Sequence, residues 1–163
     1  MKDVLHITYH SNSDHKTINV GRKLGELLRE GDVIALVGRL GSGKTWFTKG
    51  LALGIEVSRN TIVTSPSFSL LNTYEGRCPL FHIDAYRLER LSDFLSAGLD
   101  EYFYKDGIVA MEWADRWPEI LPDRTVRVEL AIVDHSSRKI ALSGHHRRAV
   151  EVLESVEENL KNV

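Results

Sequence analysis

Cysteine, excess positive charge and long apolar runs are all scarce in this sequence. A single cysteine, Cys78, cannot form an internal disulfide and excludes a cysteine-rich zinc module. The 21 Lys and Arg against 23 Asp and Glu give a net charge of −2, whereas neutralising nucleic-acid phosphates needs excess positive charge. No apolar run approaches the ~18 residues that span a bilayer, and residues 1–6 lack the apolar core of a secretory signal. We therefore expect a soluble, cytoplasmic protein that contacts no membrane and reaches RNA only locally or through a partner.

The composition is that of one folded domain. Of the 163 residues, 42% are apolar and 27% are charged, which is enough apolar side chain to build a core and too much for a disordered chain. No internal repeat, low-complexity tract or flexible linker divides the sequence. We therefore predict a single domain over residues 1–163.

Two short apolar runs predict buried strands. Residues 33–37 have no polar face, and residues 107–111 repeat this pattern. Such runs are typical of central parallel strands that are covered on both faces in α/β proteins. Alternating or apolar segments predict the remaining strands, which lie at residues 4–9, 67–74, 78–84, 126–133 and 139–142, the last two joined as a hairpin.

Helical spacing of apolar residues predicts layers that flank these strands. One helix opens at Thr17 and is closed by Gly31, and a second spans about residues 44–53. Residues 92–103 are predicted to form short helices broken around Gly98, and the chain ends in an amphipathic helix. The fold class is therefore α/β, with a mixed sheet flanked by helices.

The sharpest motif is Gly38-Arg39-Leu40-Gly41-Ser42-Gly43-Lys44-Thr45, which matches G-x-x-x-x-G-K-[ST] between a buried strand and a helix. Its glycines let successive N–H groups point inward, and the positive end of the following helix completes an anion site for a β-phosphate. Lys44 then bridges the β- and γ-phosphates, and the Thr45 hydroxyl binds Mg²⁺. The nucleotide-binding residues predicted from this turn are Gly38, Leu40, Gly41, Ser42, Gly43, Lys44 and Thr45. The motif predicts a P-loop NTPase fold.

Two acids end strand-like runs and are candidates for the metal and the chemistry. Asp84 follows Leu80–Ile83, and Glu112 follows Ile108–Met111. A charged residue directly after an apolar run is costly if it is buried without a partner, so a functional role is one interpretation. The other is that each acid surfaces at its strand end and is solvated. With Lys44, these acids are the predicted catalytic residues.

The missing signatures bear on the nucleotide. The guanine-specific Asn-Lys-x-Asp motif is absent, so we expect ATP rather than GTP. The arginine-rich lid typical of nucleotide kinases is not evident either, although Arg87 and Arg90 could serve a small version. A kinase that moves phosphate to an acceptor therefore stays as an alternative to an ATPase.

The order and spacing of several motifs between about residues 17 and 117 resemble the TsaE family of small ATPases. The Gly38–Thr45 turn is common to many families, but its combination with the other segments is specific. The segments that carry the resemblance, besides that turn, are Thr64-Ser65-Pro66-Ser67-Phe68, His82-Ile83-Asp84-Ala85-Tyr86-Arg87-Leu88, Gly98-Leu99-Asp100-Glu101-Tyr102-Phe103 and Glu112-Trp113. The sequence departs from the family pattern at Arg39, where Asp is usual, and at Ser67, where Thr is usual.

The resemblance implies a P-loop fold with ATP and Mg²⁺ as ligands. It also implies work with the TsaB and TsaD proteins, of which TsaD transfers threonylcarbamoyl to adenosine 37 of tRNA. The ATPase then binds the TsaB–TsaD pair and uses ATP to sustain turnover, reaching tRNA only through that complex. A nucleotide-gated binding module, in which hydrolysis is incidental, is a further alternative.

The resemblance also implies roles for individual residues. Glu112 matches the acid that binds the metal, and Asp84 matches a second acid that positions a metal-bound or attacking water. The Thr64–Phe68 segment matches a switch-like loop beside the γ-phosphate. Thr17 matches a position near the nucleotide, although a plain helix N-cap is an equal interpretation.

The neighbours of these acids have a structural and a functional interpretation. Trp113 either packs near the site or, as is more common for a large aromatic after a strand, lies in the core or at an interface. His82 alternates with Asp84 on one strand face, so it either supports the acid or is a hydrogen-bonded structural histidine. Tyr86 and Arg87 are expected on a partner surface rather than in catalysis, with contact to a phosphate as the alternative for Arg87.

Overall fold

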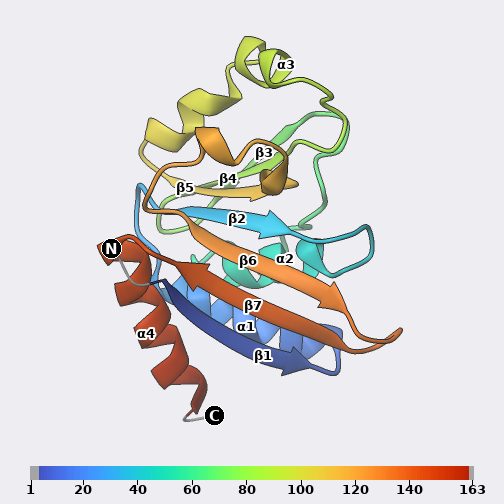
Figure 1. The fold of residues 1–163 in the computed structure, drawn as a ribbon, viewed down its shortest axis with the longest axis vertical. Helices are drawn as coiled ribbons and strands as arrows, with labels where there is room; N and C mark the ends of the chain where they lie inside the picture. Colours follow the sequence, from blue (N-terminus) through green and yellow to red (C-terminus); the bar gives the residue numbers. More distant parts are fainter. Residues whose placement is uncertain (1–3, 162–163) are drawn as a thin grey trace.

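The computed structural model describes residues 4–161, in which seven strands form one mixed sheet with the order β1-β7-β6-β2-β5-β4-β3 (Figure 1). The strands are β1 (Leu5–Ser11), β2 (Val33–Val37), β3 (Leu71–Glu75), β4 (Pro79–Asp84), β5 (Ile108–Glu112), β6 (Val126–Ile132) and β7 (Arg138–Gly144). Strands β6, β2, β5 and β4 run parallel, while β1, β7 and β3 pair antiparallel with their neighbours. The predicted α/β fold with a mixed sheet is confirmed.

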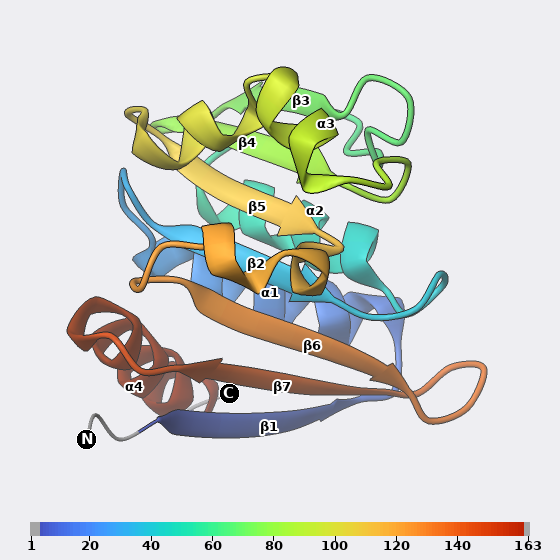
Figure 2. The same ribbon diagram turned by 45° about the horizontal axis from the view of Figure 1, so that its top comes forward.

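Helices cover the two faces of this sheet unequally (Figure 2). The α-helices are α1 (Asp14–Leu27), α2 (Lys44–Gly54), α3 (Leu91–Ser96) and α4 (Arg147–Lys161), and the 3₁₀ helices are η1 (Leu99–Tyr104), η2 (Ala114–Arg116) and η3 (Pro118–Ile120). One core lies between the sheet and a layer formed by α1, α2 and α4. A second core lies on the opposite face, between strands β2, β4 and β5 and a layer formed by α3, η1 and η2. No helix within the described range 4–161 is long and apolar enough to cross a membrane.

The central strand β2 is buried along its whole length. Ile34 and Leu36 point into the core beneath α1 and α2, whereas Val33 and Ala35 point into the core beneath η1 and η2. A strand whose alternate side chains are all buried needs apolar residues at every position. This is the physical reason for the apolar run without a polar face.

Glycines bring α1 and α2 into backbone contact. Gly21 and Gly25 on α1 face Gly50 and Gly54 on α2. A Cβ atom built on Gly50 would lie 2.1 Å from the carbonyl oxygen of Ile18, and one on Gly21 would lie 2.4 Å from that of Phe47. Only glycine fits at such a crossing, and the contact fixes the position of α2 and of the turn that precedes it.

Both ends of α1 differ from the sequence prediction. Helix α1 begins at Asp14 because Ser13 is its N-cap and accepts a hydrogen bond from the Lys16 N–H (3.2 Å). Thr17 therefore lies inside the helix, and the N-cap interpretation of this residue is wrong. The helix ends at Leu27, before Gly31, because the Leu28 N–H already closes onto the carbonyl of Gly25 (3.3 Å).

The strand predicted over residues 67–74 begins only at Leu71. The Leu70 N–H donates to the carbonyl of Pro66 (2.8 Å), and Leu70 itself adopts a left-handed conformation with φ of 70°. A chain folded back in this way cannot join a ladder, so residues 67–70 form a turn. The predicted break at Gly98 and the hairpin of β6 and β7 are confirmed.

Gly50→Ala tests the backbone contact between α1 and α2. Helix propensity alone favours alanine, but the added methyl group would meet the Ile18 carbonyl at 2.1 Å. We therefore expect the free energy of unfolding, measured in urea, to fall by about 1–3 kcal/mol. Lys49→Ala, one residue earlier on α2, is the matched control, with an expected change within about 0.5 kcal/mol. A stabilised Gly50→Ala protein would contradict the contact.

Candidate nucleotide-binding site

The turn between β2 and α2 is shaped by its glycines. Gly43 is the N-cap of α2 in a left-handed conformation, with φ of 104°. At Gly38, a Cβ atom would lie 2.5 Å from the Ser42 hydroxyl oxygen and 2.6 Å from the Leu130 carbonyl oxygen. A side chain would strain the backbone at Gly43 and collide with neighbouring atoms at Gly38. The turn ends at the positive end of α2.

A cavity of about 390 Å³ opens beside this turn, where the carboxyl ends of the parallel strands meet α2. The Gly38–Thr45, Thr64–Phe68, His82–Leu88 and Glu112–Trp113 segments all contribute to its lining, whereas Gly98–Phe103 does not. The lining residues are Asp14, Thr17, Leu40, Gly41, Ser42, Gly43, Lys44, Thr45, Trp46, Ser65, Ser67, Asp84, Tyr86, Glu112, Trp113 and Arg138. Of the site residues predicted from sequence, Gly38 alone is absent from this lining. It contributes its carbonyl oxygen to Lys44 instead. Ligands bind at this place in open α/β sheets.

Lys44 is buried at the centre of the turn. Its ammonium donates hydrogen bonds to the carbonyl oxygens of Gly38 and Arg39, the second at 3.0 Å, and lies 4.1 Å from the centre of the Trp113 ring. Burial lowers the pKa of Lys44, and the negative charges of Glu112 and Asp84 oppose this decrease. The cation is thus positioned between the turn and the acids.

Asp84 and Glu112 are directly paired across β4 and β5, and each is only 3% exposed. The Ser65 hydroxyl oxygen lies 2.5 Å from Asp84 Oδ2 and 3.2 Å from Glu112 Oε2, so its single proton lies between the two carboxylates. The backbone N–H of Tyr86 donates to Asp84 Oδ1 (2.9 Å). The interpretation in which both acids are solvated at their strand ends is therefore wrong.

The donors that converge here suit a hard cation. Thr45 offers a hydroxyl oxygen, and Asp84 and Glu112 offer carboxylate oxygens on the same cavity wall. Among residues 4–161, no cluster of three or more His, Cys, Asp or Glu side chains forms a metal site by itself. Mg²⁺ is usually held by one or two carboxylates together with substrate phosphates, so this smaller donor set fits Mg²⁺ with a nucleotide.

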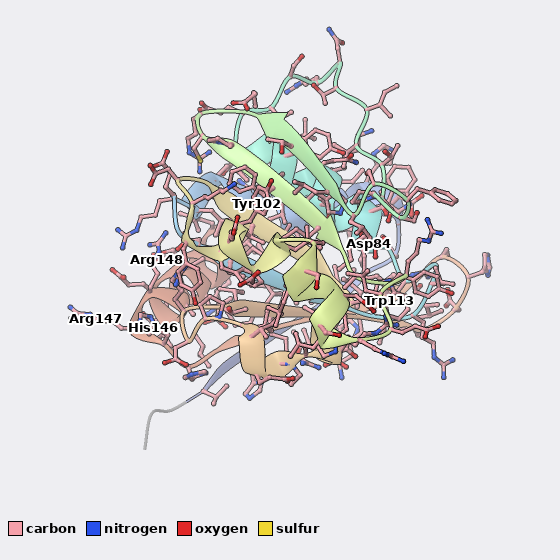
Figure 3. All side chains as sticks on the ribbon, turned by 90° about the horizontal axis from the view of Figure 1, so that it is seen from above. Asp84, Tyr102, Trp113, His146, Arg147 and Arg148 are labelled. Carbon is pink, nitrogen blue, oxygen red and sulfur yellow. The ribbon has the colours of Figure 1, made fainter. Side chains whose placement is uncertain are left out.

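Two aromatic neighbours of the acids, Tyr86 and Trp113, line the cavity. Trp113 has a left-handed backbone, with φ of 62°, and its ring lies 5.0 Å from that of Tyr86 between ring centres. Trp113 lines the cavity and also packs against the second core, so both interpretations of this residue hold. Figure 3 shows Asp84 and Trp113 on one side of the molecule and Arg148 on the opposite side. Arg87 packs on the exposed Phe68 ring, 4.7 Å from its centre.

His82 contacts an acid, but not the one that shares its strand. It is fully buried, and its Nε2 lies 2.7 Å from Glu112 Oε2 on the neighbouring strand. Thr17 also faces the cavity, with its hydroxyl 2.8 Å from that of Ser11. The sequence indicated that His82 shares a face with Asp84; the pairing of β4 with β5 decides which carboxylate it reaches.

Sequence reasoning missed Arg138, which reaches the turn from the start of β7. Its guanidinium donates to the carbonyl oxygens of Gly41 (3.0 Å) and Ser42 (3.2 Å), and to those of Asp134 (2.8 Å) and Ser137 (3.0 Å). Ninety-six residues separate Arg138 from Ser42, and no local pattern marks the arginine. Only the fold brings the two together.

Comparison with known proteins identifies the family. The model of the family described as "Threonylcarbamoyl adenosine biosynthesis protein TsaE" matches residues 11–140. The chain belongs to the TsaE family. The matched range contains every residue of the site from Thr17 to Arg138, so the family likeness extends to both sides of the cavity.

Individual TsaE proteins resemble the chain over most of its length. A Treponema pallidum protein named "tRNA threonylcarbamoyladenosine biosynthesis protein TsaE" is 41% identical over 133 residues, which cover 82% of this chain and 97% of that protein. A Bacillus subtilis protein of the same name is 38% identical over 129 residues, covering 78% and 79%. The crystal structure of Bacillus subtilis YdiB superposes with a TM-score of 0.82 at 29% identity, covering 98% of this chain and 99% of that one.

Arg138→Ala tests the hydrogen bonds that Arg138 on β7 donates to the Gly38–Thr45 turn. Without the guanidinium, the carbonyls of Gly41 and Ser42 lose their donor. We therefore expect amide hydrogen exchange in residues 41–43 to accelerate about five- to tenfold, as hydrogen bonds at half-exposed sites are worth about 1 kcal/mol. Arg138→Lys keeps the charge but not the planar guanidinium, so its exchange rate should lie between those of the wild type and Arg138→Ala. The exposed neighbour Lys139→Ala is the control, and equal exchange in all variants would refute the bond.

Proposed function

We propose that this chain binds ATP with Mg²⁺ and hydrolyses it slowly in tRNA threonylcarbamoyladenosine biosynthesis, the process for which its relatives are named. The observation that carries the proposal is the buried pair Asp84 and Glu112 facing the cation of Lys44 across one cavity. Phosphoryl transfer to water needs little covalent chemistry from a protein. It needs positioning and charge stabilisation, which these groups supply.

The turn supplies the phosphate contacts. Backbone N–H groups around Gly41 and Gly43 and the positive end of α2 attract the phosphates. In place of the carbonyl oxygens of Gly38 and Arg39, the Lys44 ammonium would bind the β- and γ-phosphates, whose negative charge is the better partner. The Arg138 guanidinium, held on the turn carbonyls, adds positive charge at the same rim.

The two acids take different roles because their oxygens are differently engaged. Both oxygens of Asp84 accept protein hydrogen bonds, from Ser65 and from the Tyr86 N–H. Glu112 uses Oε2 for His82 and Ser65, and no donor among residues 4–161 bonds its Oε1. We therefore assign Glu112, with Thr45, to hold Mg²⁺, and Asp84 to position a metal-bound or attacking water. Mg²⁺ when bound would neutralise charge on the phosphates.

We propose the TsaB–TsaD pair as the partner, with tRNA reached only through it. The cavity residues Leu40 and Tyr86 are 68% and 44% exposed, and Phe68, next to the lining residue Ser67, is 84% exposed. Exposed apolar residues beside a site favour a protein partner. The net charge of −2 does not favour direct tRNA capture. Because the described strands all join one sheet, the proposal takes residues 1–163 as one ATPase domain. The proposed role in tRNA modification places this domain in the cytoplasm.

A nucleotide-gated binding module is the second candidate. Ser65, in the switch-like segment, touches both acids, so a nucleotide that engages the acids would move this segment whether or not hydrolysis follows. In this version the ordered segment docks the partner, and ATP cleavage is incidental.

Lys44→Ala and Glu112→Gln separate binding from chemistry. Removing the Lys44 cation should raise the ATP dissociation constant at least tenfold, because it deletes a charge-assisted contact to the phosphates. Glu112→Gln should leave that constant within about threefold and lower Mg²⁺-dependent kcat about a hundredfold. Fluorescence titration and phosphate release measure the two quantities, with Lys49→Ala as the control. Normal Mg²⁺-dependent hydrolysis by Glu112→Gln would show that the metal assignment is wrong.

Multiple-turnover formation of threonylcarbamoyladenosine tests the cellular role. Purified TsaB, TsaD and tRNA receive threonylcarbamoyl-adenylate and ATP, with this protein added, omitted or replaced by Lys44→Ala. We expect only the intact protein to sustain more than one product per TsaD. If Glu112→Gln sustains turnover as well, the nucleotide-gated module is favoured; if the intact protein makes no difference, the role fails.

A further inference from the structure

His82 is a buried polar side chain that the proposed chemistry does not yet use. It is fully buried on β4, on the same strand face as Asp84 two residues later. Its Nε2 lies 2.7 Å from Glu112 Oε2, and its other ring nitrogen, Nδ1, is buried without a hydrogen-bond partner among residues 4–161. One ring nitrogen thus makes a short contact and the other makes none.

The surroundings give no structural reason for a histidine at this position. Its neighbours in the same core layer are the apolar residues Leu80, Ile108 and Ala110, and the Tyr74 ring lies 6.3 Å away between ring centres. A buried polar atom without a partner is costly, and an apolar side chain would avoid that cost. The single gain visible in the structure is the contact with Glu112.

This contact defines which oxygen of Glu112 remains available. A carboxylate that binds a metal only accepts hydrogen bonds, so for that role the His82 Nε2–H is the donor and Glu112 Oε2 the acceptor. The same Oε2 lies 3.2 Å from the Ser65 hydroxyl. Glutamate has a flexible side chain, and fixing one oxygen restricts the other to the cavity that Glu112 lines.

We propose that His82 is a positioning residue for Glu112: it holds Oε2 and so presents Oε1 to the Mg²⁺ of a bound nucleotide. The inference rests on the proposed function and deepens it by adding the residue that orients the metal-binding acid. Groups that hold metal ligands from behind typically contribute ten- to a hundredfold to metal affinity or activity. His82 does not line the cavity, so we expect its effect to be confined to the metal and the chemistry.

Three substitutions test this role. His82→Leu removes the donor, His82→Gln keeps an amide N–H about as far from the backbone as Nε2, and His82→Asn places its amide only as far as Nδ1. The measurements are Mn²⁺ affinity in the presence of a non-hydrolysable ATP analogue, the Mg²⁺ concentration for half-maximal hydrolysis, and the dissociation constant for the analogue without metal.

We expect the His82→Leu and His82→Asn variants to bind Mn²⁺ about tenfold more weakly or worse. Their Mg²⁺ concentration for half-maximal hydrolysis should rise by a similar factor. In the His82→Gln variant, both the Mn²⁺ affinity and the half-maximal Mg²⁺ concentration should lie within about threefold of the wild-type values. Metal-free affinity for the analogue should stay within twofold in all three variants. In a Glu112→Gln background, His82→Asn should change Mn²⁺ affinity no further, because the carboxylate that it serves is already gone.

Wild-type metal dependence in both His82→Asn and His82→Leu would overturn the proposal, as would equal losses in Asn and Gln. A structural role alone predicts lower stability in urea with unchanged Mn²⁺ affinity. If His82→Leu fails to fold, the contrast between Gln and Asn still decides. A wild-type protein that neither binds nor hydrolyses ATP overturns the proposed function and this inference with it, whereas active wild type with unaffected variants overturns His82 alone.

Discussion

Asp84 and Glu112 are paired in the parallel register of β4 with β5, and this pairing places two carboxylates side by side where water is largely excluded. Buried polar groups need partners, so donors or cations must lie beside both side chains. The compensating groups come from three segments: Lys44 after the turn, Ser65, and His82 with the backbone N–H of Tyr86. The rest of the site is organised around this pair, because a cation or donor must reach each carboxylate from a different direction.

Lys44 can reach the acids only if α2 begins at a defined place, and the glycine contact with α1 defines it. Backbone atoms of the two helices meet at Gly21 and Gly50, so small shifts of α2 along α1 are blocked. Arg138 holds the other side of the turn from β7. The Gly38–Thr45 turn is therefore held by α1, through its contact with α2, and by β7, through Arg138. This favours a preformed anion site over one that must order on binding.

Much of this arrangement follows from local sequence. The β2–turn–α2 unit was predictable because an apolar run, a glycine-rich turn and a helix are consecutive in the chain. The places of Asp84 and Glu112 were predictable too, because carboxyl ends of neighbouring parallel strands share one edge of a sheet. Local reasoning failed at Thr17, where Ser13 four residues earlier supplies the cap, and at Leu70, where a turn pre-empts the strand.

What the sequence determined by itself is the fold class, the phosphate turn and the identity of the acids, because each depends on residues that are near one another in the chain. The tertiary structure alone decided that His82 reaches Glu112 rather than Asp84, and that Arg138 holds a turn ninety-six residues away. These contacts depend on the order and register of strands. Register is set by the packing of the whole sheet, which no single segment of the sequence encodes.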